Sequence, residues 1–500
     1  MNRKPLTQEA VGNVGWQALV MGTNLILKAG ILILLARSMP AAQFGLVAAA
    51  TVITSLATDF SQMGVHRALV QRLRLDPAHI RTAFALSLHS GIAAAVLLFL
   101  AAPWFADLLR IEGTQSLIRF LALTLFVSGI SSVSASLLER ERRFRTLGLI
   151  DLASYFTGFG LVALPLAMVD YGAWALAVGH LTQALVRCTA MMIVATPKLA
   201  LIPRWQESKD LFRTGIGFSA GQIGNYLATQ ADYFVVGRWL GAEALGLYSR
   251  AYQFLMLPTH MFGKVTSTVL FPTLASIQDQ PERVARAYIR ALGVIALMTL
   301  PVGGALAVLA PELILFLLGS NWAGMVLPFQ ILVSMLLFRT SYKISDSVVL
   351  AMGSMYQRAR LQFLYAGAVA GGSLLGLAYG LPGVAVGVGS AVALNYLMMM
   401  TLARRVTGLS LGKVVGVQLK QLPGAAAIVA PLWIAAVAAR EAGFADHSVL
   451  GLAILSGLVA AAFAWVAVPG LFGAEGRWLR ELAVDRIETF RSGHRAAPAE

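Results

Sequence analysis

Long apolar runs follow one another from one end of the chain to the other, separated by short segments that carry most of the charged residues. A helix needs about 20 apolar residues to cross the hydrocarbon core of a bilayer, since each residue adds about 1.5 Å of rise. The alternating ten-residue pattern of a membrane β-barrel is absent. The runs predict an all-α polytopic membrane protein with about fourteen transmembrane helices, at residues 12–35, 42–64, 80–102, 116–138, 147–169, 172–195, 211–236, 244–277, 287–318, 323–350, 360–380, 382–403, 420–439 and 446–470.

Two stretches repeat one pattern at a spacing of 201 positions. Residues 29–46 read AGILILLARSMPAAQFGL and residues 230–247 read QADYFVVGRWLGAEALGL, so that Arg37 corresponds to Arg238 and Gly45 to Gly246. A repeat at nearly half the chain length indicates that one helical bundle has been duplicated.

The duplication predicts the domain organisation. Each half, 12–203 and 208–405, holds six predicted spans. Because an even number makes both halves enter the membrane in the same sense, we expect two six-helix bundles that are parallel internal repeats about an axis along the membrane normal. Transmembrane helices 13 and 14, at 420–470, lie outside the duplication. Residues 474–500 form a predicted cytoplasmic amphipathic tail that lies on the membrane surface; an ordinary solvated tail is the alternative.

Composition and charge support a membrane protein. Hydrophobic residues make up 58% of the chain and charged residues 13%, whereas soluble proteins carry about 25% charged residues. With the N-terminus in the cytoplasm, basic clusters at 67–81 and 140–145 fall inside, and the outside loops hold Arg37, Arg110, Arg238, Arg250 and Arg440. This bias follows the positive-inside rule, so we place both termini in the cytoplasm. It also accounts for the net charge of +15 without a nucleic-acid partner.

Polar residues recur on one face of several predicted spans. Asn24 and Lys28 share a face of span 12–35, and Asn225 and Asp232 share a face of span 211–236. Asn24 and Asn225 are again 201 positions apart. Equivalent polar faces on duplicated helices predict a shared, water-filled central surface. The alternative is that these side chains bridge neighbouring helices as structural hydrogen bonds.

Charged residues within the spans are the sharpest candidates for a site, because a charge at membrane depth costs a few kcal/mol. A wet, basic cavity that holds an anionic group such as a diphosphate would lower this cost; its candidate residues are Lys28, Lys264, Arg339 and Lys343. The candidate proton or sodium sites are Asp59, Asp232 and Asp346. The alternative for these acids is a buried ion pair, and Lys343 and Asp346, three positions apart, can pair.

Signals of catalysis are absent from the sequence. We find no His, Asp and Glu cluster with catalytic or metal-ligand spacing, and no G-x-x-x-x-G-K-[ST] motif. We therefore predict a transporter and not an enzyme, with no cofactor or metal. His66, His89 and His180 are interpreted as packed or interfacial residues. Pro301 and Pro311 are expected to kink span 287–318.

Three stretches resemble a known family: ADYFVVGRWLGAEALGLYSRAYQ (231–253), VLFPTLASIQ (269–278) and LAPELILFLLGSNWAGMVLPFQIL (309–332). They are similar to polysaccharide transporters, the lipid-linked oligosaccharide flippases of the multidrug/oligosaccharidyl-lipid/polysaccharide (MOP) exporter superfamily. Residues 34–72 resemble the first hairpin of that family. The resemblance extends over roughly residues 10 to 470.

The resemblance implies a function. Such proteins move an undecaprenyl-diphosphate-linked oligosaccharide, a repeat unit of exopolysaccharide or lipopolysaccharide, across the bacterial inner membrane by alternating access with ion coupling. It implies a lipid-linked oligosaccharide and membrane lipid as partners, together with a polysaccharide polymerase and the chain-length machinery. The alternative is a drug or cation antiporter of the same superfamily, which would favour an acidic, aromatic cavity. Basic residues outnumber acidic ones within the predicted spans, which favours an anionic cargo.

Overall fold

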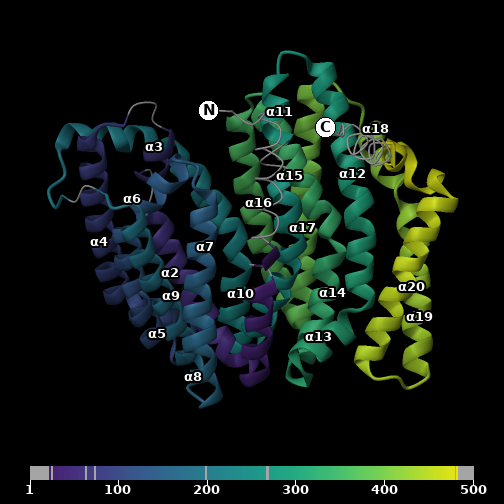
Figure 1. Ribbon diagram of the computed structural model, residues 1–500, viewed down its shortest axis with the longest axis horizontal. Coiled ribbons are helices and arrows are strands. Elements are labelled where there is room, and N and C mark those ends of the chain that lie inside the picture. Colours follow the sequence, from purple (N-terminus) through teal and green to yellow (C-terminus); the bar gives the residue numbers. More distant parts are fainter. Residues whose placement is uncertain are drawn as a thin grey trace, which may run out of the picture. The chain divides into compact units, whose positions relative to one another are not determined.

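The computed structural model describes residues 22–23, 26–61, 65–71, 75–197, 200–265, 270–478 and 480–481. Within these ranges the regular structure is helical throughout (Figure 1). The helices group into two compact units, Met1–Arg250 and Ala251–Glu500. Residues 12–21 and 24–25 of the predicted span 12–35, and the tail from residue 482 on, lie outside the described residues.

The first unit contains a helix at residues 26–38 and a bundle that follows it. Its elements are α2 (Ala41–Ser61), α3 (Val65–Gln71), α4 (Pro77–Leu109), α5 (Thr114–Leu121), α6 (Leu123–Arg140), α7 (Phe144–Tyr155), the π-helix η1 (Phe156–Ala163), α8 (Leu164–Met168), α9 (Ala173–Val194) and the first part of α10 (Trp205–Val265). Helices α2, α6 and α9 pack against one another in this unit (Figure 1).

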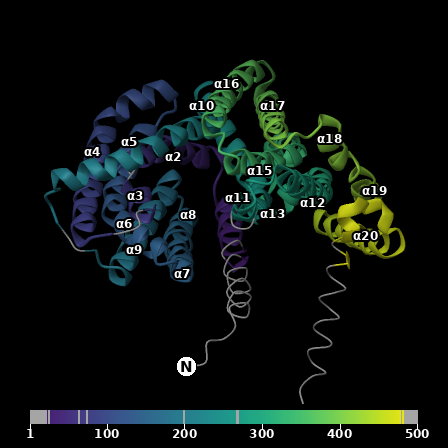
Figure 2. The ribbon, with the colours of Figure 1, turned by 90° about the horizontal axis from the view of Figure 1, so that it is seen from above.

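The second unit starts within α10. It continues with α11 (Phe271–Ser276), α12 (Pro281–Val308), α13 (Ala310–Leu318), η3 (Ser320–Met325), α14 (Val326–Ser334), α15 (Leu336–Ala351), α16 (Met355–Gly376), η4 (Leu377–Tyr379), α17 (Gly380–Thr407), α18 (Leu411–Leu419), α19 (Leu422–Glu441), α20 (Asp446–Ala467) and η5 (Pro469–Phe472). Helices α16 and α17 pack side by side, as do α19 and α20 (Figure 2).

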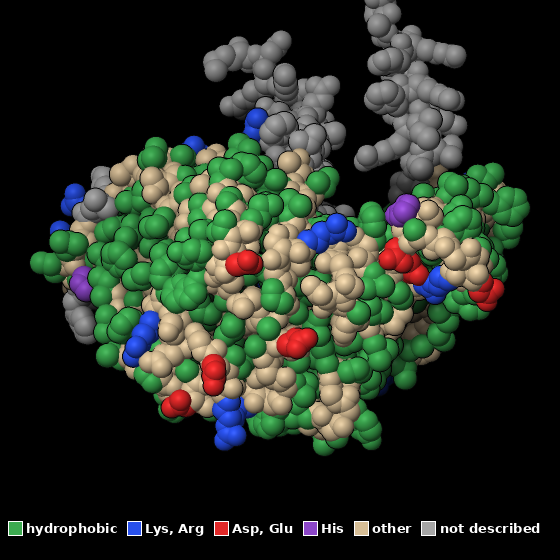
Figure 3. Space-filling model, turned by 90° about the horizontal axis from the view of Figure 1, so that it is seen from below, with side chains coloured by type: hydrophobic (Ala, Val, Ile, Leu, Met, Phe, Trp, Pro, Cys, Tyr) green, Lys and Arg blue, Asp and Glu red, His purple; other side chains and the backbone are tan. Residues whose placement is uncertain are grey.

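The protein is a multi-pass membrane protein. Nine segments of the described chain are long and apolar enough to cross a bilayer, or ten if the pair Ser320–Ser334 and Leu336–Ala351, bent by 42°, counts as one span. One of the nine, Met355–Thr407, holds both α16 and α17. The predicted span 211–236 falls on α10, and the predicted span 244–277 covers the last part of α10 and all of α11. Hydrophobic side chains cover most of the face drawn in Figure 3, and charged ones are scattered over it.

Glycines from the two repeated stretches meet within the first unit. A Cβ added at Gly45 would lie 1.7 Å from the Ala242 carbonyl oxygen, and one added at Gly246 would lie 1.9 Å from the Ala41 carbonyl oxygen. Ala41 and Ala242 are themselves 201 positions apart. The contact is therefore reciprocal: each glycine touches the equivalent partner in the other stretch, as in a contact across a two-fold axis.

The turn between the predicted spans 211–236 and 244–277 is a single residue. Gly241 has φ 85°, a backbone conformation that glycine adopts without strain, and the chain is helical on both sides of it. Arg238 and Arg250 therefore lie in α10, and Arg440 lies in α19. The sequence assigned these three residues to outside loops; they lie within helices, and the side of the membrane that they face stays a prediction.

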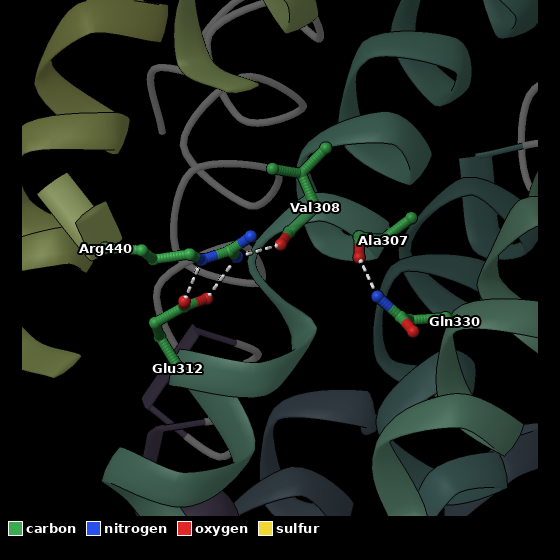
Figure 4. Close-up of polar contacts among 5 residues, drawn as sticks. All are labelled: Ala307, Val308, Glu312, Gln330 and Arg440. Carbon is green, nitrogen blue, oxygen red and sulfur yellow. Dashed lines mark hydrogen bonds and ion pairs between the residues drawn. The ribbon is translucent and has the colours of Figure 1, made fainter. Parts of the chain in front are cut away.

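Pro311 does more than kink the span 287–318. Helix α12 ends at Val308, and Pro311 stands in the first turn of a separate helix, α13, since proline fits a helix start and lacks the N–H needed further in. The freed carbonyls are bonded by other helices: Gln330 Nε2 donates to Ala307 O at 2.8 Å, and Arg440 donates to Val308 O at 2.8 Å (Figure 4).

Arg440 also binds a buried carboxylate at this break. Its guanidinium bonds both oxygens of Glu312, at 2.5 and 2.8 Å (Figure 4). The Glu312 side chain is 5% exposed and that of Arg440 36%. This bidentate pair joins α19, which lies outside the predicted duplication, to α13.

Candidate functional site

A cluster of charged residues on α15 and its neighbours is the strongest site in the second unit. Arg339 is 8% exposed, although its guanidinium carries a full charge. It donates a hydrogen bond to the Tyr252 hydroxyl and lies over the Tyr252 ring, with Cζ 4.6 Å from the centroid. A desolvated cation on an aromatic face gains about 2 kcal/mol. Tyr252, on α10, therefore positions Arg339 and offsets part of the cost of burying it.

The next turn of α15 adds a second cation. Lys343 follows Arg339 by four positions, on the same helical face, and is half-buried. Asp346 binds Arg358 of α16, with Nε to Oδ1 at 2.5 Å and Nη2 to Oδ2 at 3.1 Å. Among the ion pairs of the described residues, Asp346 thus pairs with Arg358 and not with Lys343. Because this pair is neutral as a whole, Arg339 and Lys343 leave the cluster positively charged.

Lys28 belongs to the first unit and has a different environment. It is exposed, on the helix at residues 26–38. Its ammonium lies 5.3 Å from the centroid of the Tyr155 ring, at the end of α7. That ring stacks on Phe159 of the π-helix, with the two centroids 4.8 Å apart. An exposed cation–π contact of this kind contributes about 0.5–1 kcal/mol, which leaves the ammonium accessible to a ligand.

Asp232 is fully enclosed in the first unit. Its carboxylate accepts hydrogen bonds from the Tyr248 hydroxyl, at 2.8 Å, and from its neighbouring backbone N–H, that of Tyr233, at 3.0 Å. The side chain is 1% exposed. These two donors are uncharged groups, whereas Asp346 accepts hydrogen bonds from the guanidinium of Arg358.

Four further candidates cannot be placed in either cluster. Asn24 lies outside the described residues, as do the side chains of Asn225, Lys264 and Asp59, whose helical backbones are described. Within the part of the chain that is described, no group of three or more His, Cys, Asp and Glu residues could hold a metal ion.

The partners of the charged residues were missed at the level of sequence. Tyr252 and Tyr155 each contact a candidate residue from a different helix, Tyr248 contacts Asp232 from the other side of Gly241 in α10, and Arg358 follows Asp346 across a turn. An aromatic residue in an apolar run gives no signal that distinguishes it from core. The contacts of His66 were also not predicted: His66 forms hydrogen bonds with Ser136 Oγ at 2.7 Å and with Glu139 at 2.9 Å, which connect α3 to α6.

Comparison with known proteins identifies the family. The family described as "Polysaccharide biosynthesis protein" matches residues 34–327, more than half of the chain. The chain belongs to this polysaccharide biosynthesis protein family. The resemblance seen in the sequence is thereby confirmed.

Curated relatives of this family member carry related names. The lipopolysaccharide biosynthesis protein WzxC of Escherichia coli (strain K12) is 26% identical over 337 residues, which cover 65% of this chain and 67% of WzxC. The succinoglycan biosynthesis transport protein ExoT of Rhizobium meliloti (strain 1021) is 28% identical over 323 residues, covering 65% and 64%. The match thus spans about two thirds of each relative.

Solved structures share the fold. The lipid II flippase MurJ in an inward closed conformation has a TM-score of 0.72 at 14% identity, and the match covers 90% of this chain and 98% of MurJ. An inward-facing MATE family multidrug resistance transporter of the MOP superfamily has a TM-score of 0.61 at 17% identity, covering 77% and 95%. The polysaccharide biosynthesis family member therefore has the helical fold of MOP transporters.

Proposed function

We propose that the protein translocates an undecaprenyl-diphosphate-linked oligosaccharide, a repeat unit of an exopolysaccharide or lipopolysaccharide, across the bacterial inner membrane by alternating access. Membership of the polysaccharide biosynthesis family supports the substrate class, and the names of WzxC and ExoT agree with it. The fold shared with a lipid II flippase supports transport of a lipid-linked cargo.

The observation that carries the proposal is the positive cluster on α15. A diphosphate moving through apolar surroundings needs cations that are held in place, because its charge loses the hydration of water. Arg339 presents a planar guanidinium, which suits phosphate oxygens, and Lys343 supplies a second charge one turn away. Tyr252 fixes the direction of the guanidinium. Lys28 and Lys264 are proposed as further diphosphate contacts, with Asn24 and Asn225 as glycan contacts.

The domain organisation remains part of the proposal: bundles at 12–203 and 208–405 as parallel repeats, with extra helices at 420–470 and a cytoplasmic tail at 474–500. The reciprocal contact of Gly45 and Gly246 supports the repeat, since equivalent residues meet as partners do across a two-fold axis. Both termini are proposed to be cytoplasmic on the charge bias of the loops. A polysaccharide polymerase and chain-length machinery would receive the cargo.

Ion coupling would use the acidic residues. Asp232 is a proposed candidate, because it is 1% exposed and protonation or sodium binding there would change the charge of a buried site. Asp346 is held by a guanidinium, which stabilises its ionised form and disfavours exchange. Asp59 is retained as a candidate. The net positive charge that Arg339 and Lys343 give to the α15 cluster disfavours binding of a drug cation, and therefore disfavours an antiporter.

The proposal is tested in a strain whose surface polysaccharide depends on this protein. Arg339→Gln should reduce surface polysaccharide at least about tenfold, the loss expected for one charge-assisted contact of about 1.5–3 kcal/mol. Arg360→Gln, which removes an exposed arginine on α16, is the matched control and should leave export unchanged. Immunoblots of membranes check that each variant accumulates. Normal export by Arg339→Gln at equal abundance would contradict the assignment.

A further inference from the structure

A polar pocket lies inside the first unit, where α2, α6 and α9 pack together. Its volume is about 210 Å³. Its lining consists mainly of polar side chains, and Leu121 and Ala184 are its apolar members. Polar side chains on membrane helices are costly unless they face a partner or water, so their convergence from three helices marks a functional surface.

The wall on α9 carries three hydrogen-bonding groups in helical register. His180, Gln183 and Arg187 are spaced three and four positions apart, which places them on one face of the helix. Arg187 Nε bonds Asp151 Oδ1 at 2.7 Å, so its charge is balanced. Among the hydrogen bonds between described residues, none is made by the side chain of His180 or Gln183. These two groups retain the capacity to bind a ligand.

The π-helix η1 holds this wall in place. Gly158 of η1 approaches α9 so closely that an added Cβ would lie 2.5 Å from the Gly179 carbonyl oxygen and 2.9 Å from the Gln183 backbone nitrogen. The His180 ring meets the Phe159 ring edge-on, with centroids 4.9 Å apart. π-helical segments inside α-helices are frequent at functional sites, and here η1 packs against the backbone that carries His180 and Gln183.

The opposite wall is made of hydroxyl groups. Thr51 and Thr54 donate to backbone carbonyls of α2, at 3.0 and 3.1 Å, and Thr124 of α6 donates to the carbonyl of Leu121, the last residue of α5, at 2.6 Å. A hydroxyl that donates in this way keeps its acceptor lone pairs. Ser128 and Ser131 continue the row on α6. The pocket thus combines acceptors on one side with an amide and an imidazole on the other.

We propose that this pocket binds one neutral sugar ring of the glycan cargo, and that His180 and Gln183 hydrogen-bond its hydroxyl groups. The inference rests on the proposed function, because it names a contact for the sugar of the same cargo. Hydroxyl, amide and imidazole groups can pair with the hydrogen-bond donors and acceptors of a sugar. The Arg187–Asp151 pair is neutral overall, which suits an uncharged ligand. The volume equals about seven water molecules at about 30 Å³ each, so one ring fits in place of ordered water.

The experiment measures binding of two lipids to the full chain in nanodiscs. The probes are undecaprenyl diphosphate that carries a neutral trisaccharide and undecaprenyl diphosphate without sugar. The wild type should bind the glycosylated lipid about tenfold more tightly, the effect of two hydrogen bonds to uncharged groups. The double variant His180→Phe/Gln183→Leu should lose this preference and keep its affinity for the bare lipid. Thr189→Leu, at an exposed position of α9, is the control and should keep the preference.

The outcomes separate the two proposals. A wild type that binds neither lipid overturns the proposed function. A wild type that binds both lipids equally, or a double variant that keeps the preference, overturns the sugar pocket alone. Equal loss of affinity for both lipids in the double variant shows a structural role and also overturns it. If the double variant does not fold, Gln183→Leu alone is measured and should lower the preference about threefold.

Discussion

Substitution of Gly45 by alanine tests the reciprocal contact of the two repeated stretches. The added Cβ would lie 1.7 Å from the Ala242 carbonyl oxygen. Since such a carbon and oxygen approach to about 3.3 Å, the two segments must separate by about 1.6 Å. Overpacking of this size costs about 1–3 kcal/mol or more, which exceeds the gain of at most about 1 kcal/mol from replacing glycine in a helix.

The assay is reversible unfolding of purified protein in mixed micelles, followed by circular dichroism. Gly45→Ala and Gly246→Ala should each lower the free energy of unfolding by about 1–3 kcal/mol. Gly30→Ala is the matched control, because nothing lies within 4 Å of its added Cβ; it should be neutral or slightly stabilising.

Reciprocity adds a second, stricter expectation. Once the first substitution has separated the segments, the second added Cβ causes a smaller steric clash. The double variant Gly45→Ala/Gly246→Ala should therefore lose less free energy of unfolding than the two single variants combined. Wild-type stability in Gly45→Ala would refute the close contact. Strictly additive losses would refute the reciprocal arrangement even if each single variant were destabilised.

Two other contacts give predictions of defined size. Glu312→Gln should lower the free energy of unfolding by about 2–3 kcal/mol, which is less than for a fully buried pair because Arg440 is 36% exposed. A double-mutant cycle with Arg440→Gln measures the coupling energy between the two side chains. A coupling energy near zero would contradict the ion pair. Tyr252→Phe keeps the ring against Arg339 but removes its hydroxyl acceptor, so about 1–3 kcal/mol of stability should be lost; unchanged unfolding and unchanged export would show that the hydroxyl does not position Arg339.

The long apolar runs of the sequence were enough to predict most of the helical segments. The runs at 80–102, 116–138, 172–195 and 446–470 coincide with membrane-length segments because burial in lipid demands uninterrupted apolar residues. Local breaks were harder to predict. Pro311 was expected to kink a helix and instead begins one, since the outcome depends on whether Gln330 and Arg440 are near enough to bond the freed carbonyls.

The charged face of α15 could be read from helical spacing, but its environment could not. Arg339 and Lys343 share a face by their separation of four positions. Tyr252, 87 positions earlier, is brought to Arg339 by tertiary packing alone. Asp346 has Lys343 one turn away on its own helix but bonds Arg358, which α16 carries back past α15. Partner choice is decided by geometry across helices, which spacing within one helix does not contain.

The polar pocket shows the same limit. His180 was interpreted as an ordinary packed residue, because neither His180 nor Gln183 stands in a charged or metal-binding motif. The pocket arises only where α9 meets α2 and α6. The π-helix η1 behind it has an apolar sequence, and no feature of that sequence distinguishes a π turn from an α turn.

The central claim is that this protein carries a lipid-linked oligosaccharide across a membrane. The most direct measurement uses proteoliposomes in which undecaprenyl-diphosphate oligosaccharide is labelled on the glycan and a membrane-impermeant oxidant destroys the label on the outer leaflet. The account predicts that vesicles with the protein lose nearly all of the label, whereas protein-free vesicles lose about half. Loss of only half in both kinds of vesicle, with the protein folded and inserted, would contradict it.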